Sequence, residues 1–123
     1  MKKIAFWILS VSFLVIALTC DKIETKKGTA AFGANYGVIN CPTSVTVYVD
    51  NRKIGTLESP VDSITDCGQK WTLTRDLSIG QHSYRVEIRP LSGIGCTKDL
   101  TGTVQIEENE CTIVFIDYYT IDF

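Results

Sequence analysis

The fold of this chain is decided by one stretch of sequence, Val45-Thr46-Val47-Tyr48-Val49-Asp50-Asn51-Arg52-Lys53-Ile54-Gly55. Valine occupies every second position from 45 to 49, and this period of two is typical of a β-strand that buries one of its faces. Asp50 and Asn51 follow, and both residue types tolerate the left-handed backbone of a tight turn. The sequence therefore predicts a β-hairpin over residues 44–57.

The chain around this hairpin continues the pattern of short strands and turns. We expect further strands at about 29–34, 71–77, 83–89, 100–106 and 111–118. The first reads as an edge strand, and Trp71 shares a face with Leu73 in the second. The last is apolar on both faces, which is typical of a central strand. No window shows the 3.6-residue period of a helix, so residues 29–123 are predicted to form an all-β domain, a single antiparallel β-sandwich of six or seven short strands.

The N-terminus has the pattern of an export signal. Lys2 and Lys3 precede an apolar run over residues 4–18, and Cys20 follows it. A charged segment before an apolar run of this length is typical of a signal peptide. The run is also shorter than the roughly 20 residues that a membrane-spanning helix needs.

The segment Ala17-Leu18-Thr19-Cys20 resembles the lipobox of bacterial lipoproteins. The resemblance implies a lipoprotein signal peptide at 1–19, a lipidated Cys20 as the first mature residue, and a polar tether through residue 28. It also implies a place in the cell envelope, anchored by lipid to the outer membrane and either periplasmic or exposed at the surface. An ordinary secretory signal and an uncleaved N-terminal anchor remain the alternatives.

The charge balance excludes one class of partner. Without Lys2 and Lys3, the basic residues fall from 12 to 10 against 14 acidic ones, so the chain after Cys20 is mildly acidic. Nucleic-acid binders need a basic surface to neutralise phosphates. We therefore expect no nucleic-acid partner.

Four cysteines remain after Cys20, namely Cys41, Cys67, Cys96 and Cys111. An even number in a small exported chain indicates up to two disulfides. The absence of a C-x-x-C pair weighs against a zinc site. A simple up-and-down trace puts the first three at one end of the sandwich, so we expect one bond among them, with Cys67–Cys96 favoured over Cys41–Cys67.

The sequence holds no recognisable catalytic group, cofactor motif or metal site. His82 is the only histidine, and it opens a strand directly after a turn, where we expect it to face water. The acidic residues near 62–66 and 107–110 lack the regular ligand spacing of a calcium loop. We expect a protein that is not an enzyme.

Aromatic residues give the strongest functional indication. Tyr48, Trp71, Tyr118, Tyr119 and Phe123 exceed what a small core needs and form a candidate binding surface for a glycan or a protein. The other interpretation, which we favour, is that they cover a second buried face of a two-sided sheet.

The stretch from residue 45 to 116 resembles small immunoglobulin-like or carboxypeptidase-regulatory-like β-sandwiches of Bacteroidetes-type surface lipoproteins. The resemblance rests on the hairpin quoted above and on two further segments, Leu77-Ser78-Ile79-Gly80-Gln81-His82-Ser83-Tyr84 and Gly102-Thr103-Val104-Gln105-Ile106. It implies a lipid-anchored, non-catalytic binding or accessory module. The alternatives are a structural subunit that docks to an envelope complex through its aromatic C-terminal strand and, more weakly, an accessory domain of a secreted hydrolase.

Overall fold

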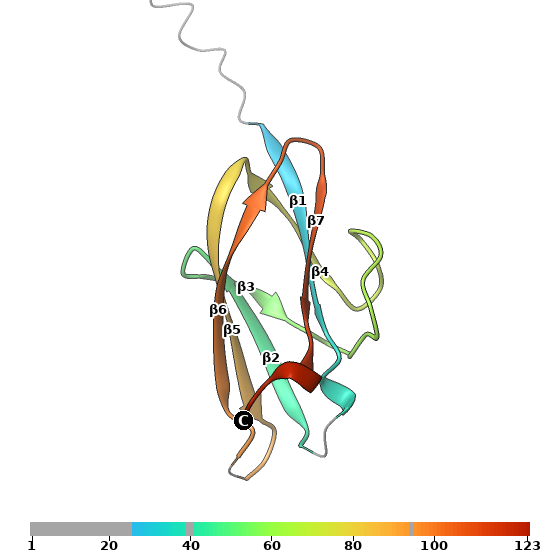
Figure 1. The fold of residues 1–123 in the computed structure, drawn as a ribbon, viewed down its shortest axis with the longest axis vertical. Coiled ribbons are helices and arrows are strands. Elements are labelled where there is room, and N and C mark those ends of the chain that lie inside the picture. The colour runs from blue at the N-terminus through green and yellow to red at the C-terminus, as the bar shows by residue number, and fades with distance from the viewer. Residues whose placement is uncertain (1–25, 39–40, 94) are drawn as a thin grey trace, which may run out of the picture.

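The computed structural model describes residues 26–38, 41–93 and 95–123 (Figure 1). The predicted signal peptide, Cys20 and most of the tether lie outside these residues. The seven strands are β1 (Lys27–Ala34), β2 (Thr43–Val49), β3 (Arg52–Thr56), β4 (Leu73–Ser78), β5 (Gly80–Pro90), β6 (Lys98–Ile106) and β7 (Cys111–Ile116). Two short 3-10 helices, η1 (Tyr36–Val38) and η2 (Tyr118–Thr120), complete the described elements. No helix within the described ranges is long and apolar enough to cross a membrane.

The strands form two sheets that pack face to face, which confirms the predicted all-β sandwich. One sheet has the order β3-β2-β5-β6 and is antiparallel throughout. The other has the order β4-β1-β7, and in it β1 pairs antiparallel with β4 but parallel with β7. The prediction of a purely antiparallel fold is therefore wrong for this one pair. The first and last strands run in the same direction, which local sequence patterns do not reveal.

The hairpin that decides the fold is present as predicted. Val45, Val47 and Val49 are buried, and the residues between them are half-buried on the outer face. Asp50 and Asn51 adopt φ values of 50° and 65°, the left-handed conformation that a tight turn between twisted strands requires. This alternation places one face of the four-stranded sheet against the core.

Strand β1 is central in its sheet, so the prediction of a first edge strand is wrong. Its inward side chains, among them Phe32, enter the core, while Ala31 and Gly33 face outward and are nonetheless buried. The loop between β3 and β4 covers this outer face, and its Val61 and Ile64 lie against Gly33. Because β1 is buried on both faces, it consists largely of alanine and glycine, and it begins at Lys27 inside the predicted tether.

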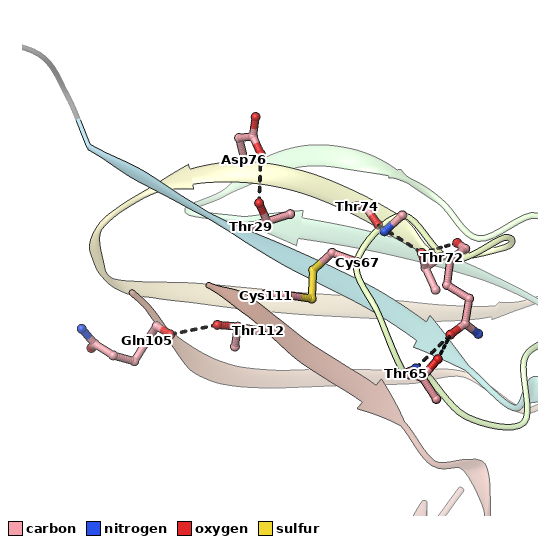
Figure 2. Close-up of a disulfide and its surroundings, with 11 residues drawn as sticks. Thr29, Thr65, Cys67, Thr72, Thr74, Asp76, Gln105, Cys111 and Thr112 are labelled. Carbon is pink, nitrogen blue, oxygen red and sulfur yellow. Dashed lines mark hydrogen bonds between the residues drawn. A yellow bond between two sulfur atoms is a disulfide. The ribbon is translucent and has the colours of Figure 1, made fainter. Parts of the chain in front are cut away.

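Two disulfides join the four cysteines that follow Cys20, and neither favoured pairing is present. Cys41 bonds Cys96, which satisfies the expectation of one bond among the first three cysteines. Cys67 bonds Cys111 instead of Cys96, with a Cα–Cα distance of 5.7 Å. The β3–β4 loop carries Cys67 back across the outer face of β1 to the start of β7, as Figure 2 shows. The simple up-and-down strand order that the sequence suggested does not include this passage of the loop back across β1.

Strand β7 is an edge strand, although its two apolar faces predicted a central one. It ends at Ile116, two residues earlier than expected, because the Asp117 side chain accepts a hydrogen bond from the Tyr119 amide and caps η2. The outward Ile113 remains 41% exposed. The apolar outer face of β7 therefore continues the surface that the β3–β4 loop covers, without being fully covered itself.

We expect Gly33→Ala to lower the free energy of unfolding by about 1–3 kcal/mol, the usual cost of overpacking a core. A Cβ at this position would lie 2.8 Å from Ile64 Cδ1 and 3.0 Å from Val61 Cγ2, so the covering loop would have to move. Urea unfolding with the disulfides intact measures the change. Gly37→Ala is the matched control, since its Cβ would meet no atom closer than 3.4 Å. Equal stability of the two variants would show that the loop does not pack tightly on β1.

Candidate functional site

The most exposed apolar side chains lie at one end of the sandwich. The chain enters at Lys26 and Lys27, and we call the opposite end the distal end; it comprises residues 35–38, 41–42, 91–93, 95–97 and 117–123 (Figure 1). At this end Tyr119 is 75% exposed, Leu91 67% and Phe123 47%. Exposed apolar groups that gather in one place mark an interaction surface more often than scattered ones do.

The C-terminal tail is fixed at the distal end through Tyr118. The Tyr118 hydroxyl lies 3.0 Å from the Thr43 hydroxyl, and the Tyr118 amide donates to Asn35 Oδ1 at 2.6 Å. Burial raises the pKa of this phenol, against the opposing effect of the hydrogen bond with Thr43. Tyr118 is only 2% exposed, so its assignment to a binding surface is wrong and it belongs to the core.

The remaining candidate aromatics are not brought together. Tyr48 lies on the outer face of the four-stranded sheet, where the Arg85 guanidinium covers its ring at 4.4 Å and its hydroxyl donates to Glu87 at 3.3 Å. Trp71 precedes β4 in a turn with φ 71°, because the Thr72 amide and hydroxyl both donate to the Gln69 carbonyl. Its predicted place in a strand is therefore wrong. Of the five aromatics, only Tyr119 and Phe123 are exposed at the distal end.

A cleft of about 400 Å³ opens beside the distal end, between β6 and β7. Its apolar lining comes from Leu100 of β6, Val114 of β7, Tyr84 of β5 and Ile121 of the tail. Lys98, Asp117 and Asp122 are the charged residues that line it. Four separate segments contribute to this cleft, so no sequence motif could have indicated it.

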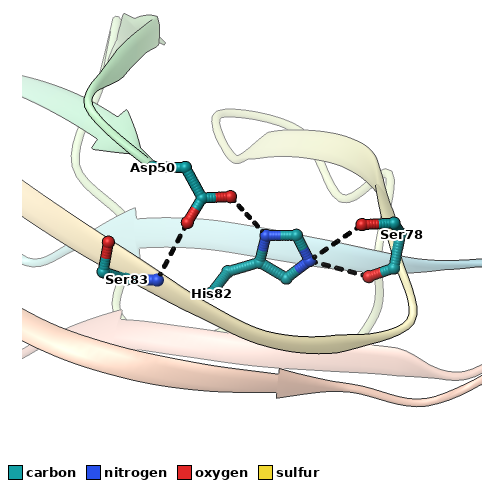
Figure 3. Close-up of polar contacts among 4 residues, drawn as sticks. All are labelled: Asp50, Ser78, His82 and Ser83. Carbon is teal, nitrogen blue, oxygen red and sulfur yellow. Dashed lines mark hydrogen bonds and ion pairs between the residues drawn. The ribbon is translucent and has the colours of Figure 1, made fainter.

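His82 is buried, contrary to the expectation that it faces water. Figure 3 shows its ring between two turns. Nδ1 lies 2.5 Å from Asp50 Oδ2, and Nε2 lies 2.7 Å from the Ser78 carbonyl oxygen. Asp50 also accepts the Ser83 amide at 3.1 Å. His82 therefore links the β2–β3 turn of one sheet to the end of β4 in the other.

The Asp50–His82–Ser78 arrangement has the residue types of a catalytic triad but not its hydrogen bonding. A triad histidine needs an Nε2 that accepts a proton from the serine hydroxyl. Here Nε2 donates to the Ser78 carbonyl, while the Ser78 hydroxyl is more distant at 3.3 Å. Both ring nitrogens act as donors, which favours the imidazolium form. The arrangement is an ionic link between the sheets, and the expectation of a non-enzyme stays a prediction.

The electrostatics of this link agree with its geometry. The hydrogen bond that His82 donates to Asp50, reinforced by the one that it donates to the Ser78 carbonyl, raises the pKa of His82 above its ordinary value of 6.5, although burial opposes the shift. The same hydrogen bond is the largest cause that lowers the pKa of Asp50 below 3.8. The ion pair is therefore favoured at every pH between the lowered pKa of Asp50 and the raised pKa of His82.

No group of three or more potential ligands that could hold a metal ion occurs within residues 26–38, 41–93 and 95–123. The two disulfides indicate an oxidising, extracytoplasmic environment. No family model matches the chain, and no curated protein or solved structure matches it either.

We expect the free energy of unfolding to fall as the pH rises from about 6 to 9. A raised folded-state pKa means that the His82 contribution is fully present below pH 6.5 and is lost as the pH passes the folded-state value. His82 is the only histidine, so no other side chain of ordinary pKa titrates near neutrality. Urea unfolding across this range measures the slope.

His82→Gln should flatten this slope, and so should Asp50→Asn, which keeps a residue that tolerates the left-handed turn. A wild-type stability that stays constant or rises between pH 6 and 9 would contradict the doubly donating histidine.

Proposed function

We propose that this protein is a lipid-anchored, non-catalytic binding module of the cell envelope whose distal end binds a protein partner. One observation carries the proposal. The two most exposed large apolar side chains, Tyr119 and Leu91, and the exposed Phe123 all belong to segments at the end of the sandwich opposite the point where the chain enters.

The position of the proposed anchor determines which end of the domain would face away from the membrane. Cys20 precedes Lys26 by six residues, and β1 starts at Lys27. A lipid on Cys20 would hold the Lys27 end near the membrane. The 11-residue strand β5 spans about 35 Å at roughly 3.3 Å per residue. The distal end would therefore project away from the bilayer toward other envelope molecules.

The composition of the distal end favours a protein ligand. Aromatic side chains are enriched at the centres of protein interfaces, where charged residues are depleted. Tyr119 and Phe123 come from the tail and Leu91 from the β5–β6 loop. The Leu91 amide donates to the Pro42 carbonyl at 3.0 Å, so this loop is held against its neighbour. A firmly held surface loses little conformational entropy when it binds.

A structural subunit of a larger envelope complex is the second candidate function. The observation that favours it is the position of the exposed Tyr119 directly beside the buried Tyr118, whose ring packs against that of Phe123 with 5.7 Å between the centroids. Such a tail could dock permanently without disturbing the core. The two functions share a surface and differ in the lifetime of the complex.

A photo-crosslinking amino acid at position 119 should give one discrete protein adduct in intact cells. The same amino acid at position 79 is the matched control, because Ile79 is also exposed, at 40%, but lies near the chain entry. Leu91→Ser should reduce the adduct at position 119 at unchanged expression. Equal adducts at both positions, or none at position 119, would contradict a distal binding surface.

Cys20→Ala should move the protein from the membrane fraction to the soluble fraction. Two acyl chains give stable attachment, and their loss leaves no anchor of comparable strength. Fractionation followed by immunoblotting measures the shift, and protease treatment of intact cells then tells surface from periplasm. A variant that still partitions fully with membranes would contradict the lipid anchor.

A further inference from the structure

Strand β6 presents an unpaired edge beside the cleft. It is the last strand of its sheet, and its backbone pairs only with β5 among the described strands. Natural proteins protect such edges with proline, bulges, short strands or charges. β6 has nine residues in continuous register with β5, and its outward residues from 101 to 105 are Thr101, Thr103 and Gln105. This part of the edge lacks those protections.

The direction of the backbone groups follows from two hydrogen bonds. The Ser83 carbonyl accepts a hydrogen bond from the Asp50 amide at 2.8 Å. The odd-numbered residues of β5 therefore direct their backbone N–H and C=O groups toward β2, and the even-numbered residues direct theirs toward β6. In the β5–β6 register, Ser83 lies opposite Thr103 and Tyr84 opposite Gly102. Thr101 and Thr103 therefore direct their N–H and C=O groups away from β5.

The second hydrogen bond confirms this parity. The Thr112 hydroxyl of β7 lies 3.4 Å from the Gln105 carbonyl and donates to it, so this outward carbonyl of β6 already receives a donor. Gln105, Thr103 and Thr101 share one parity. Toward the distal end β6 and β7 diverge, as Figure 1 shows, and the backbone groups of Thr103 and Thr101 form no hydrogen bond to a backbone other than that of β5 among the described residues.

A strand edge by itself offers only main-chain hydrogen bonds, whereas the cleft beside it can distinguish between the side chains of a ligand. Its apolar residues Leu100, Val114 and Ile121 lie on the inner side of the β6 edge. A cavity of about 400 Å³ is within the range of specific ligand pockets. Gly102 contributes to its shape, because the Tyr84 ring occupies the position where a Cβ would lie.

The charges at the cleft favour a basic ligand. Asp117 and Asp122 line it from the tail, against Lys98 from β6. Asp117 accepts neutral donors from Asn35 and Tyr119, and none of the ion pairs between described residues includes either carboxylate. A cationic side chain near the tail would therefore find two carboxylates.

We infer that the β6 edge binds an extended peptide segment of a partner protein by strand addition. The peptide pairs with Thr101 and Thr103, inserts an apolar side chain into the cleft and directs a lysine or arginine toward Asp117 and Asp122. This mode of recognition combines main-chain hydrogen bonds with side-chain pockets. The inference rests on the proposed function, because it names the class of ligand for a binding module whose distal surface adjoins the cleft.

A synthetic peptide of alternating valine and threonine with a lysine at each end tests the inference on the full-length protein in detergent micelles. We expect a Kd of about 10–100 μM, typical of a short peptide without optimised contacts. Hydrogen exchange should slow at the amides of Thr101 and Thr103 when the peptide is added. Asp117→Asn with Asp122→Asn should weaken binding about threefold to tenfold, and added salt should weaken it too.

Two N-methylated peptides provide the matched control without changing the protein. Methylation of every second amide removes the donors of one edge only, so one of the two patterns should abolish binding and the other should preserve it. Equal effects of both patterns, protection elsewhere in the chain, or no binding up to about 1 mM would overturn the inference. Concentration-dependent dimers that protect the same amides without peptide would also overturn it, in favour of a second copy.

The crosslinking experiment at position 119 separates this inference from the proposed function. If the distal adduct forms while the peptide fails to bind, the binding module stands and strand addition falls. If the peptide binds while the distal adduct is absent, the cleft alone is the interface, and the proposed distal surface falls.

Discussion

The fold depends on the burial of β1 from both sides. Its inner face needs only the opposite sheet, but its outer face needs the β3–β4 loop, since Ala31 and Gly33 would otherwise face water. Small side chains make the close approach of Val61 and Ile64 sterically possible. The Cys67–Cys111 bond then holds the loop across β1 (Figure 2). The central strand of the three-stranded sheet is thereby covered on both faces without an additional layer of secondary structure.

The parts of the fold that local patterns determine could be predicted from the sequence. The alternation in β2 and the Asp50-Asn51 turn predicted the first hairpin, and the strand expected at 83–89 is present within β5. Relations between distant segments could not be predicted. The parallel pairing of β1 with β7, the disulfide partners and the burial of His82 each depend on contacts more than 25 residues apart in the chain.

The candidate site illustrates the same division. Composition pointed correctly to excess aromatic residues, and Tyr119 and Phe123 are indeed exposed. The alternation of inward and outward residues in a strand could not separate them from Tyr118, because β7 ends at Ile116 and the 3-10 helix η2 replaces that alternation after Asp117. The cleft and the free β6 edge needed the sheet order, which no stretch of sequence encodes by itself.

The order of the cysteines has a consequence for how the protein is made. The two bonds interleave along the chain, since Cys67 lies between Cys41 and Cys96 while its partner Cys111 lies beyond both. A chain that crosses a membrane with its N-terminus first presents Cys41 and Cys67 to the oxidising compartment before either native partner arrives. Oxidation in order of emergence joins the wrong pair, and thiol–disulfide exchange must then correct it. The interleaved pairing is therefore incompatible with joining the cysteines strictly in the order in which they emerge.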